Sequence, residues 1–197
     1  MSFILNHWPL TFVCVAMIVA AVIDGWKLKV PNWLTFPLVV SGWVLGLLHT
    51  FSLLESTGAG GIGASLAGTA LGFVLLFPVY AIGGMGAGDV KMQMGFGAWI
   101  GAFFGFEGGA LSIIWWAFAL AVVIGGVLAT IMILVRGQFR RNLVNTKAIL
   151  GDLAGGVGNA SDKAADRKPR MHLLPYGIPL CLGFIGYLVF FARGLAV

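Results

Sequence analysis

Long apolar segments are the feature of this sequence that most restricts its fold. They lie at residues 8–23, 33–50, 61–82, 90–106, 110–135 and 173–193. A helix of about 20 apolar residues crosses the roughly 30 Å hydrocarbon layer of a bilayer, and only helices and closed barrels satisfy their backbone hydrogen bonds there. The segments therefore predict an all-α, polytopic membrane protein of about six transmembrane helices, with the lipid bilayer as its surroundings.

The composition points the same way. Of the 197 residues 59% are hydrophobic and 10% are charged, whereas soluble proteins carry about 25% charged residues. Six spans use most of the chain, so we expect a single transmembrane domain over 1–197. The segment 90–106 is the least apolar of the six, because Lys91, Gln93 and several glycines interrupt it.

The basic residues predict the orientation in the membrane. If the N-terminus is outside, 11 of the 12 basic residues fall in cytosolic loops, as the positive-inside rule requires. We therefore expect both termini outside and a cytosolic loop at 136–172. Asp24 and Asp89 then lie on the cytosolic side, and Glu55 and Glu107 lie outside. Because the net charge of +5 is explained by topology, we expect no nucleic-acid partner.

Glycines recur at four-residue steps in two neighbouring segments. Gly68 and Gly72 lie in the third segment, and the fourth contains Gly97, Gly101 and Gly105. Small residues at this spacing let helices approach closely in lipid. We expect the third and fourth helices to pack tightly against each other.

Two aspartates are the candidate catalytic residues. Asp24 follows the first apolar segment, and Asp89 lies between the third and the fourth. An ionisable residue at membrane depth costs a few kcal/mol, so it marks a functional site by default. Six spans bring both residues to the same face of the membrane, although 65 positions (89 − 24) separate them.

Paired carboxyl groups suit peptide hydrolysis. The reaction needs a base to activate water and an acid to protonate the departing amine, and two adjacent carboxyls that share one proton supply both. Such a pair needs no metal. The chain has only three histidines and two cysteines, without a cluster at metal-ligand spacing, so we expect no metal and no other cofactor.

The glycines before Asp89 leave two interpretations open. In the sequence GGMGAGD they permit positive φ and close backbone approach, so the carboxyl could lie at a helix N-terminus beside an extended peptide. The same pattern fits an ordinary interhelical turn in which Asp89 caps a helix. The pattern alone does not decide between these interpretations.

Three segments resemble motifs of the bacterial type IV prepilin peptidases, in the same order along the chain. GGMGAGDVKMQMGFGAWIG, from residue 83, is similar to the segment in which GxGD supplies one catalytic aspartate. DGWKLKVPNWLT, from residue 24, is similar to the other aspartate motif, and LPYGIPLCLG, from residue 174, to the segment at the start of the last helix. Together they extend over most of the chain.

The resemblance implies a function and a set of site residues. It implies an aspartic endopeptidase of the GxGD type, with Asp24 and Asp89 as its catalytic pair and Gly86 and Gly88 shaping the second aspartate's site. Lys91 and Pro31 occupy motif positions and, together with Gly86 and Gly88, are assigned to substrate binding. Lys91 could instead anchor its helix at the interface, and Pro31 could simply begin a helix.

The resemblance also implies a substrate and a location. The expected substrate is a pilin-like precursor with a basic leader, cut at the cytosolic face of a bacterial inner membrane. The chain lacks the CxxC-bearing extension of the long form, so it is most similar to the short, peptidase-only branch that serves Flp, or tight-adherence, pili. An archaeal preflagellin peptidase is an alternative, and a proton-coupled transporter subunit is the rival from another class.

Overall fold

The structure, a computed structural model, describes residues 8–27, 29–54, 58, 60–81, 85–135 and 176–190. This part of the chain forms six α-helices and no strand: α2 (Trp8–Lys27), α3 (Asn32–Thr50), α4 (Ile62–Ala81), α5 (Ala87–Phe104), α6 (Ala110–Val135) and α9 (Gly177–Phe190). Each helix coincides with one predicted apolar segment, which confirms the predicted fold class. The predicted cytosolic loop at 136–172 lies outside the described residues.

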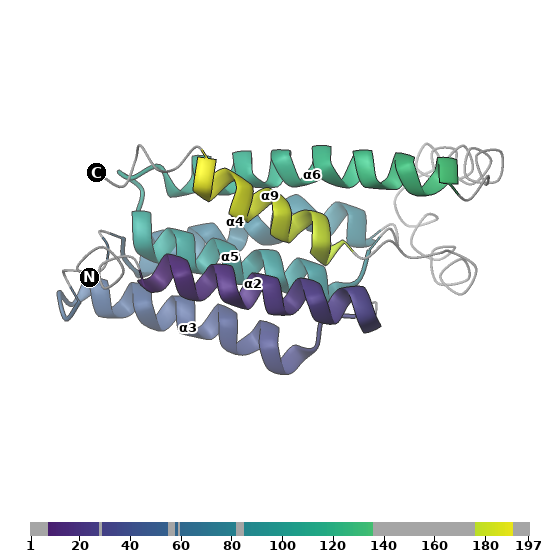
Figure 1. Cartoon of the computed structure of the whole chain (residues 1–197). Coiled ribbons are helices and arrows are strands. Elements are labelled where there is room, and N and C mark those ends of the chain that lie inside the picture. The colour runs from purple at the N-terminus through teal and green to yellow at the C-terminus, as the bar shows by residue number, and fades with distance from the viewer. Residues whose placement is uncertain are drawn as a thin grey trace.

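The helices run up and down in one bundle (Figure 1). We call "the site end" the end at which α2, α4 and α6 finish and α3, α5 and α9 begin. Because the chain crosses the bundle an even number of times, the N-terminal end of α2 and the C-terminal end of α9 lie together at the opposite end. That this opposite end faces the outside of the cell remains a prediction.

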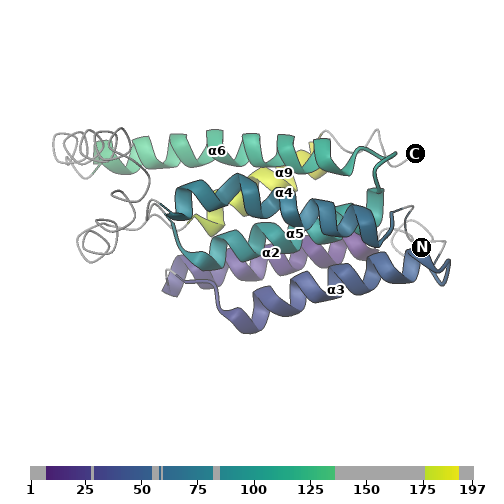
Figure 2. The ribbon, with the colours of Figure 1, turned by 180° about the vertical axis from the view of Figure 1, so that it is seen from behind.

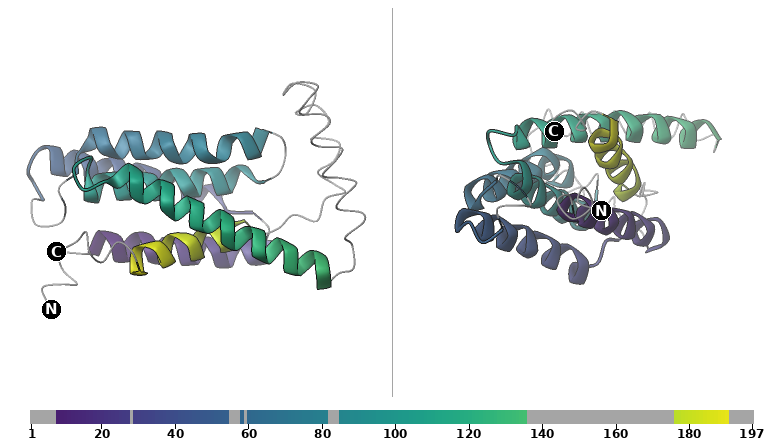
Figure 3. Two further views of the ribbon diagram at one scale, coloured as in Figure 1. Left: turned by 90° about the horizontal axis from the view of Figure 1, so that it is seen from above. Right: turned by 60° about the vertical axis from the view of Figure 1, so that its left-hand side comes forward.

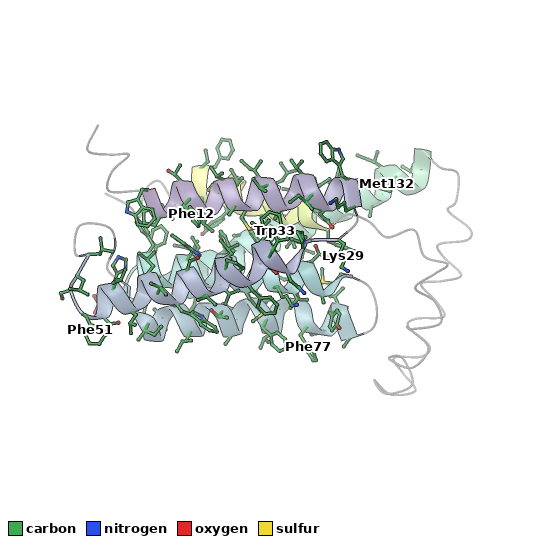
Figure 4. The ribbon with its side chains drawn as sticks, turned by 90° about the horizontal axis from the view of Figure 1, so that it is seen from below. Phe12, Lys29, Trp33, Phe51, Phe77 and Met132 are labelled. Carbon is green, nitrogen blue, oxygen red and sulfur yellow. The ribbon has the colours of Figure 1, made fainter. Side chains whose placement is uncertain are left out.

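The outward surface of the bundle is apolar. Four helices are long and apolar enough to cross a membrane, namely α2, α3, α4 and α6, and α9 is a shorter apolar helix. Large apolar side chains such as Val22, Val40 and Val74 are exposed along them. Figure 4 shows Phe51 and Phe77 directed away from the bundle. Surface of this kind is compatible with lipid and unfavourable in water, so the chain is a membrane protein.

Helix α5 is the buried centre of the bundle. It packs most extensively against α4 and α3, and it also contacts α2, α6 and α9. Helix α2 lies in front of α5 in Figure 1. Helix α4 lies on the other side of α5, nearer the viewer in Figure 2. Its residues are buried without interruption from Gly95 to Phe104. A helix enclosed by others need not match lipid, which explains why α5 is the least apolar of the predicted spans.

Glycine contacts hold α4 against α5, as predicted. A Cβ atom added at Gly68 would collide with the carbonyl oxygen of Gly97, and one added at Gly101 would collide with that of Ala64. A Cβ at Gly72 would lie 2.6 Å from the carbonyl oxygen of Gln93. Gly105, the next glycine of the spacing, is the C-cap residue that ends α5, with a φ of 67°.

Polar side chains within the bundle fix α3, α4 and α5 relative to one another. The Ser65 hydroxyl of α4 lies 3.1 Å from the carbonyl oxygen of Gly42 on α3 and 2.9 Å from that of Ala98 on α5. The indole N–H of Trp99 donates to the carbonyl oxygen of Leu38 at 2.9 Å. These bonds hold the helix that carries Asp89 in a fixed register.

Helix α9 closes the bundle on the side of α2 and α6. It packs against both helices, and Figure 3 shows it beside α2 with α6 crossing over them. The ring of Phe184 stacks on Phe96 of α5 with 4.2 Å between centroids. A Cβ at Gly183 would collide with the backbone of Ala121 on α6. The last helix is thereby seated against the central one.

Candidate active site

Asp24 lies in the last turn of α2 and is almost completely enclosed, with 3% of its surface exposed. Its Oδ2 accepts a hydrogen bond of 2.8 Å from the backbone N–H of Gly177, the first residue of α9. A residue near the N-terminus of the chain is thus held by one near the C-terminus. The contact joins the first and third sequence motifs.

Asp89 lies in the first turn of α5 and is also enclosed, with 5% of its surface exposed. Its Oδ2 accepts the backbone N–H of Gly86 at 3.3 Å. The helix N-terminus favours a negative charge at this position. Asp89 is not the N-cap residue, since Gly86 takes that place, but its side chain reaches back to the cap as the acid of a capping box does.

The second oxygen of Asp89 is the distinctive atom of the site. Oδ1 is buried and has no hydrogen-bond partner among the residues that the structure describes. Most buried polar atoms in folded proteins have such a partner. One oxygen of Asp89 is therefore used by the helix, and the other is unpaired within the described chain.

Both carboxyl groups lie at the site end. Asp24 and Asp89 are near enough to influence each other electrostatically, and Tyr176, the residue before α9, is near enough to Asp89 to do the same. Helices α2, α5 and α9 also pack against one another. The structure therefore brings together the two aspartates, which the sequence placed at one membrane face, and adds the start of α9.

Gly86 and Gly88 play different structural roles. Gly86 has a φ of −81°, and Gly88 is helical, so neither adopts the positive φ that a glycine permits. The predicted close approach holds for Gly88, because a Cβ there would lie 2.7 Å from the carbonyl oxygen of Val30. Gly88 thus lets the first turn of α5 lie against the connection between α2 and α3.

Pro31 and Lys91 also lie at the site end, where both contact α3. Pro31 is the N-cap of α3, and its carbonyl oxygen accepts the N–H of Leu34 at 3.2 Å. Lys91 Nζ donates to Asn32 Oδ1 at 2.9 Å and lies 4.4 Å from the centre of the Phe36 ring. These contacts tie α5 to α3. A role for either residue in substrate binding remains a prediction.

Gly177 and Tyr176 are site residues that the sequence did not single out. Their signal was the segment LPYGIPLCLG, which marked the beginning of the last helix without showing what that beginning contacts. Within the described part of the chain, no three His, Cys, Asp or Glu side chains are grouped as metal ligands would be. The groups that the site offers there are carboxyls, a phenol and backbone amides.

Comparison with known proteins adds a family. The model of the type IV leader peptidase family matches residues 11–134, which is more than half of the 197-residue chain. Asp24 and Asp89 both lie within the match, and α9 lies after it. Neither a search of curated proteins nor a search of solved structures gave a match.

Proposed function

The chain belongs to the type IV leader peptidase family, and from that premise we propose that it is an aspartic endopeptidase with Asp24 and Asp89 as its catalytic pair. Its substrate is a pilin-like precursor with a basic leader, in the bacterial inner membrane. The observation that carries this proposal is the placement of both carboxyls at one end of the bundle. They lie 65 positions apart in sequence, yet both are buried at one end of the bundle and interact there.

The pair can perform both proton transfers of peptide hydrolysis. One carboxylate removes a proton from water while the water oxygen attacks the carbonyl carbon of the scissile bond. The other carboxyl, protonated, gives its proton to the amine nitrogen as the C–N bond breaks. Either group can begin as the base, because two interacting carboxyls titrate as one unit.

The backbone contacts suit this chemistry. The N–H groups of Gly177 and Gly86 each hold one oxygen of a carboxyl, and such charge-assisted bonds restrict rotation. Asp89 Oδ1 has no partner in the described chain. An attacking water bound between the aspartates would provide one.

The position of the site relative to the membrane supports cleavage of the precursor at the cytosolic face. The three lysines of the described residues, Lys27, Lys29 and Lys91, are all at the site end, and Figure 4 shows Lys29 there. Trp26 and Trp33, 84% and 67% exposed, lie at the same end. Lysines favour the cytosolic side, and exposed tryptophans favour the membrane interface. A precursor with a cytosolic basic leader and an apolar span has its junction at this level.

This depth also bears on the rival functions. Carboxylates of a proton relay lie along a pathway through the bilayer, whereas Asp24 is in the last turn of α2 and Asp89 in the first turn of α5. Their place at the rim favours an endopeptidase. The chemistry of the pair suits a pilin or a flagellin leader equally, and the resemblance to the short pilus branch favours pilin.

Replacing either aspartate by asparagine tests the proposal. Asparagine keeps the size of the side chain and an oxygen for the glycine N–H, but it cannot exchange a proton. We expect Asp24→Asn and Asp89→Asn each to lower the cleavage rate by at least about a hundredfold, and the double variant to be scarcely worse. The measurement is shortening of a pilin precursor on a gel, with the variants at matched levels in membranes.

Glu107 provides the control, because it lies in the turn between α5 and α6 at the opposite end of the bundle. Glu107→Gln should cleave as the wild type does. Substantial processing by either aspartate variant would contradict the aspartic mechanism. Preferential cutting of a preflagellin leader over a pilin leader would favour the archaeal-type alternative.

A further inference from the structure

Gln93 is a buried polar residue without a hydrogen-bond partner in the described part of the chain. Its side chain is 0% exposed, and neither Oε1 nor Nε2 has a hydrogen-bond partner among the described residues. Two other buried polar side chains of the bundle are fully paired: Ser65 with two carbonyl oxygens, and Thr69 with the carbonyl oxygen of Ser65. The only other buried side-chain atom without a partner in the described chain is Asp89 Oδ1, one helical turn away.

Helix geometry places the Gln93 side chain beside the candidate catalytic pair. Asp89, Gln93 and Phe96 are spaced i, i+4 and i+7, so they share one face of α5. Both neighbours on this face are oriented by contacts: Asp89 interacts with Asp24 and Tyr176, and Phe96 stacks on Phe184 of α9. Gln93 lies between them, one turn deeper in the bundle than Asp89, and its backbone carbonyl oxygen lies against Gly72 of α4.

An unpaired amide at this position is unfavourable in the free protein. A buried polar group without a hydrogen bond is costly in an apolar environment, and a carboxamide has both donors and an acceptor to satisfy. Methionine or leucine would fill the same volume without that cost. A group that pairs with Gln93 while the protein works would account for the amide.

We infer that Gln93 binds a backbone peptide group of the substrate, next to the bond that is cut. This inference rests on the proposed function. A peptide group presents one C=O and one N–H, which complement the NH₂ and C=O of a carboxamide. A substrate helix must unwind to be cut, and its freed backbone groups then need partners inside the membrane. Gln93 is one turn from the carboxyls and can provide such a partner.

The test uses Gln93→Met, which keeps the length of the side chain and removes its polar atoms. Loss of the contact to the substrate should raise KM for a pilin precursor about three- to tenfold, with a smaller change in kcat. The thermal midpoint of the detergent-solubilised protein should stay equal or rise, because no internal hydrogen bond is lost. A higher KM together with an unchanged or higher thermal midpoint distinguishes a contact with the substrate from a contact that stabilises the protein.

Ser65→Ala is the matched control. Ser65 is also 0% exposed, but its hydroxyl is paired within the bundle. This substitution should lower the thermal midpoint and leave KM unchanged. An unchanged KM in Gln93→Met, with or without a lower midpoint, would overturn the inference and mean that Gln93 pairs only with water or within the protein.

A binding measurement separates this inference from the proposed function. In the Asp24→Asn background, binding of a fluorescent precursor peptide is compared with and without Gln93→Met. Binding that Gln93→Met weakens by a similar three- to tenfold factor supports the contact. If the Asp24→Asn protein nevertheless cleaves the precursor, that result refutes the aspartic mechanism and leaves the Gln93 contact standing. Equal binding, together with inactive aspartate variants, would refute the Gln93 contact and leave the proposed function intact.

Discussion

Backbone amides orient both carboxyls of the candidate pair. Asp24 accepts the N–H of Gly177 from the start of α9, and Asp89 accepts that of Gly86 from the preceding turn. The first of these contacts requires a glycine. A Cβ at Gly177 would lie 2.9 Å from both the Cβ and the Oδ2 atoms of Asp24. The third sequence motif thus provides a donor and leaves room for the carboxyl that it holds.

Gly177→Ala tests that requirement. The added methyl group would push on the buried Asp24 carboxyl, and small displacements of a catalytic group reduce rates strongly. We expect kcat for precursor cleavage to fall about ten- to a hundredfold while the protein still inserts and is recovered from membranes. The measurement is the initial cleavage rate at saturating precursor.

Gly126→Ala is the control for this substitution. Gly126 lies on α6, and a Cβ there would meet nothing within 4 Å. Since alanine is the better helix former, this variant should keep full activity and equal or greater stability. If Gly177→Ala cleaved as fast as Gly126→Ala, the close contact would have no role in positioning Asp24.

Some residues of the site could be predicted from the sequence and others could not. Asp24 and Asp89 were identifiable because charged residues are rare among apolar segments, and six crossings place them at one end. The contact from Gly177 to Asp24 could not be predicted, because a backbone donor leaves no mark on residue type and lies 153 positions away. Gln93 was noted only as a polar interruption, since burial and pairing are properties of the packed bundle.

At the scale of the helices, the contact between α4 and α5 positions Asp89. Gly68 and Gly97 face each other across this contact with no space for a Cβ on either. Four-residue glycine spacing predicted the contact, because it repeats on one side of a helix. The beginning of α5 was predicted less well. Hydropathy placed it at residue 90, whereas the helix begins at Ala87 and carries Asp89 in its first turn.

Gly68→Ala is expected to loosen this contact. The Cβ would collide with the carbonyl oxygen of Gly97, and overpacking of this kind costs about 1–3 kcal/mol. We expect a lower free energy of unfolding in detergent, together with reduced cleavage because α5 carries Asp89. Titration with a denaturing detergent measures the first quantity.

The matched substitution is Gly63→Ala on the same helix. A Cβ there would lie 3.8 Å from the Phe106 ring, an ordinary van der Waals contact. Gly63→Ala should unfold with the wild-type midpoint or a slightly higher one, because alanine is the better helix former. Equal midpoints for the two variants would mean that the α4–α5 contact adapts to an added methyl group.

At the scale of the whole molecule, the even number of crossings places both outer helix ends on one side. With the lysines of the site end on the cytosolic side, a reporter fused after Val197 should behave as external and one inserted in 136–172 as cytosolic. The measurement is the activity of a reporter that is active on only one side of the membrane. A cytosolic signal after Val197 would contradict the topology and the proposed side of cleavage.

The enclosed position of α5 has a consequence for how the protein is made. Among the described helices, α2, α3, α4 and α6 have the length and hydropathy of independent spans, and α5 is absent from that set. A weakly apolar segment gains little from entering lipid alone, so we expect α5 to be inserted stably only in the company of its neighbours. Because α3 and α4 precede α5 in the sequence, they are synthesised first and can pack against α5 as it leaves the ribosome. The aspartate on α5 would then reach its partner on α2 only in a correctly assembled protein, so unassembled chains would have no proteolytic activity.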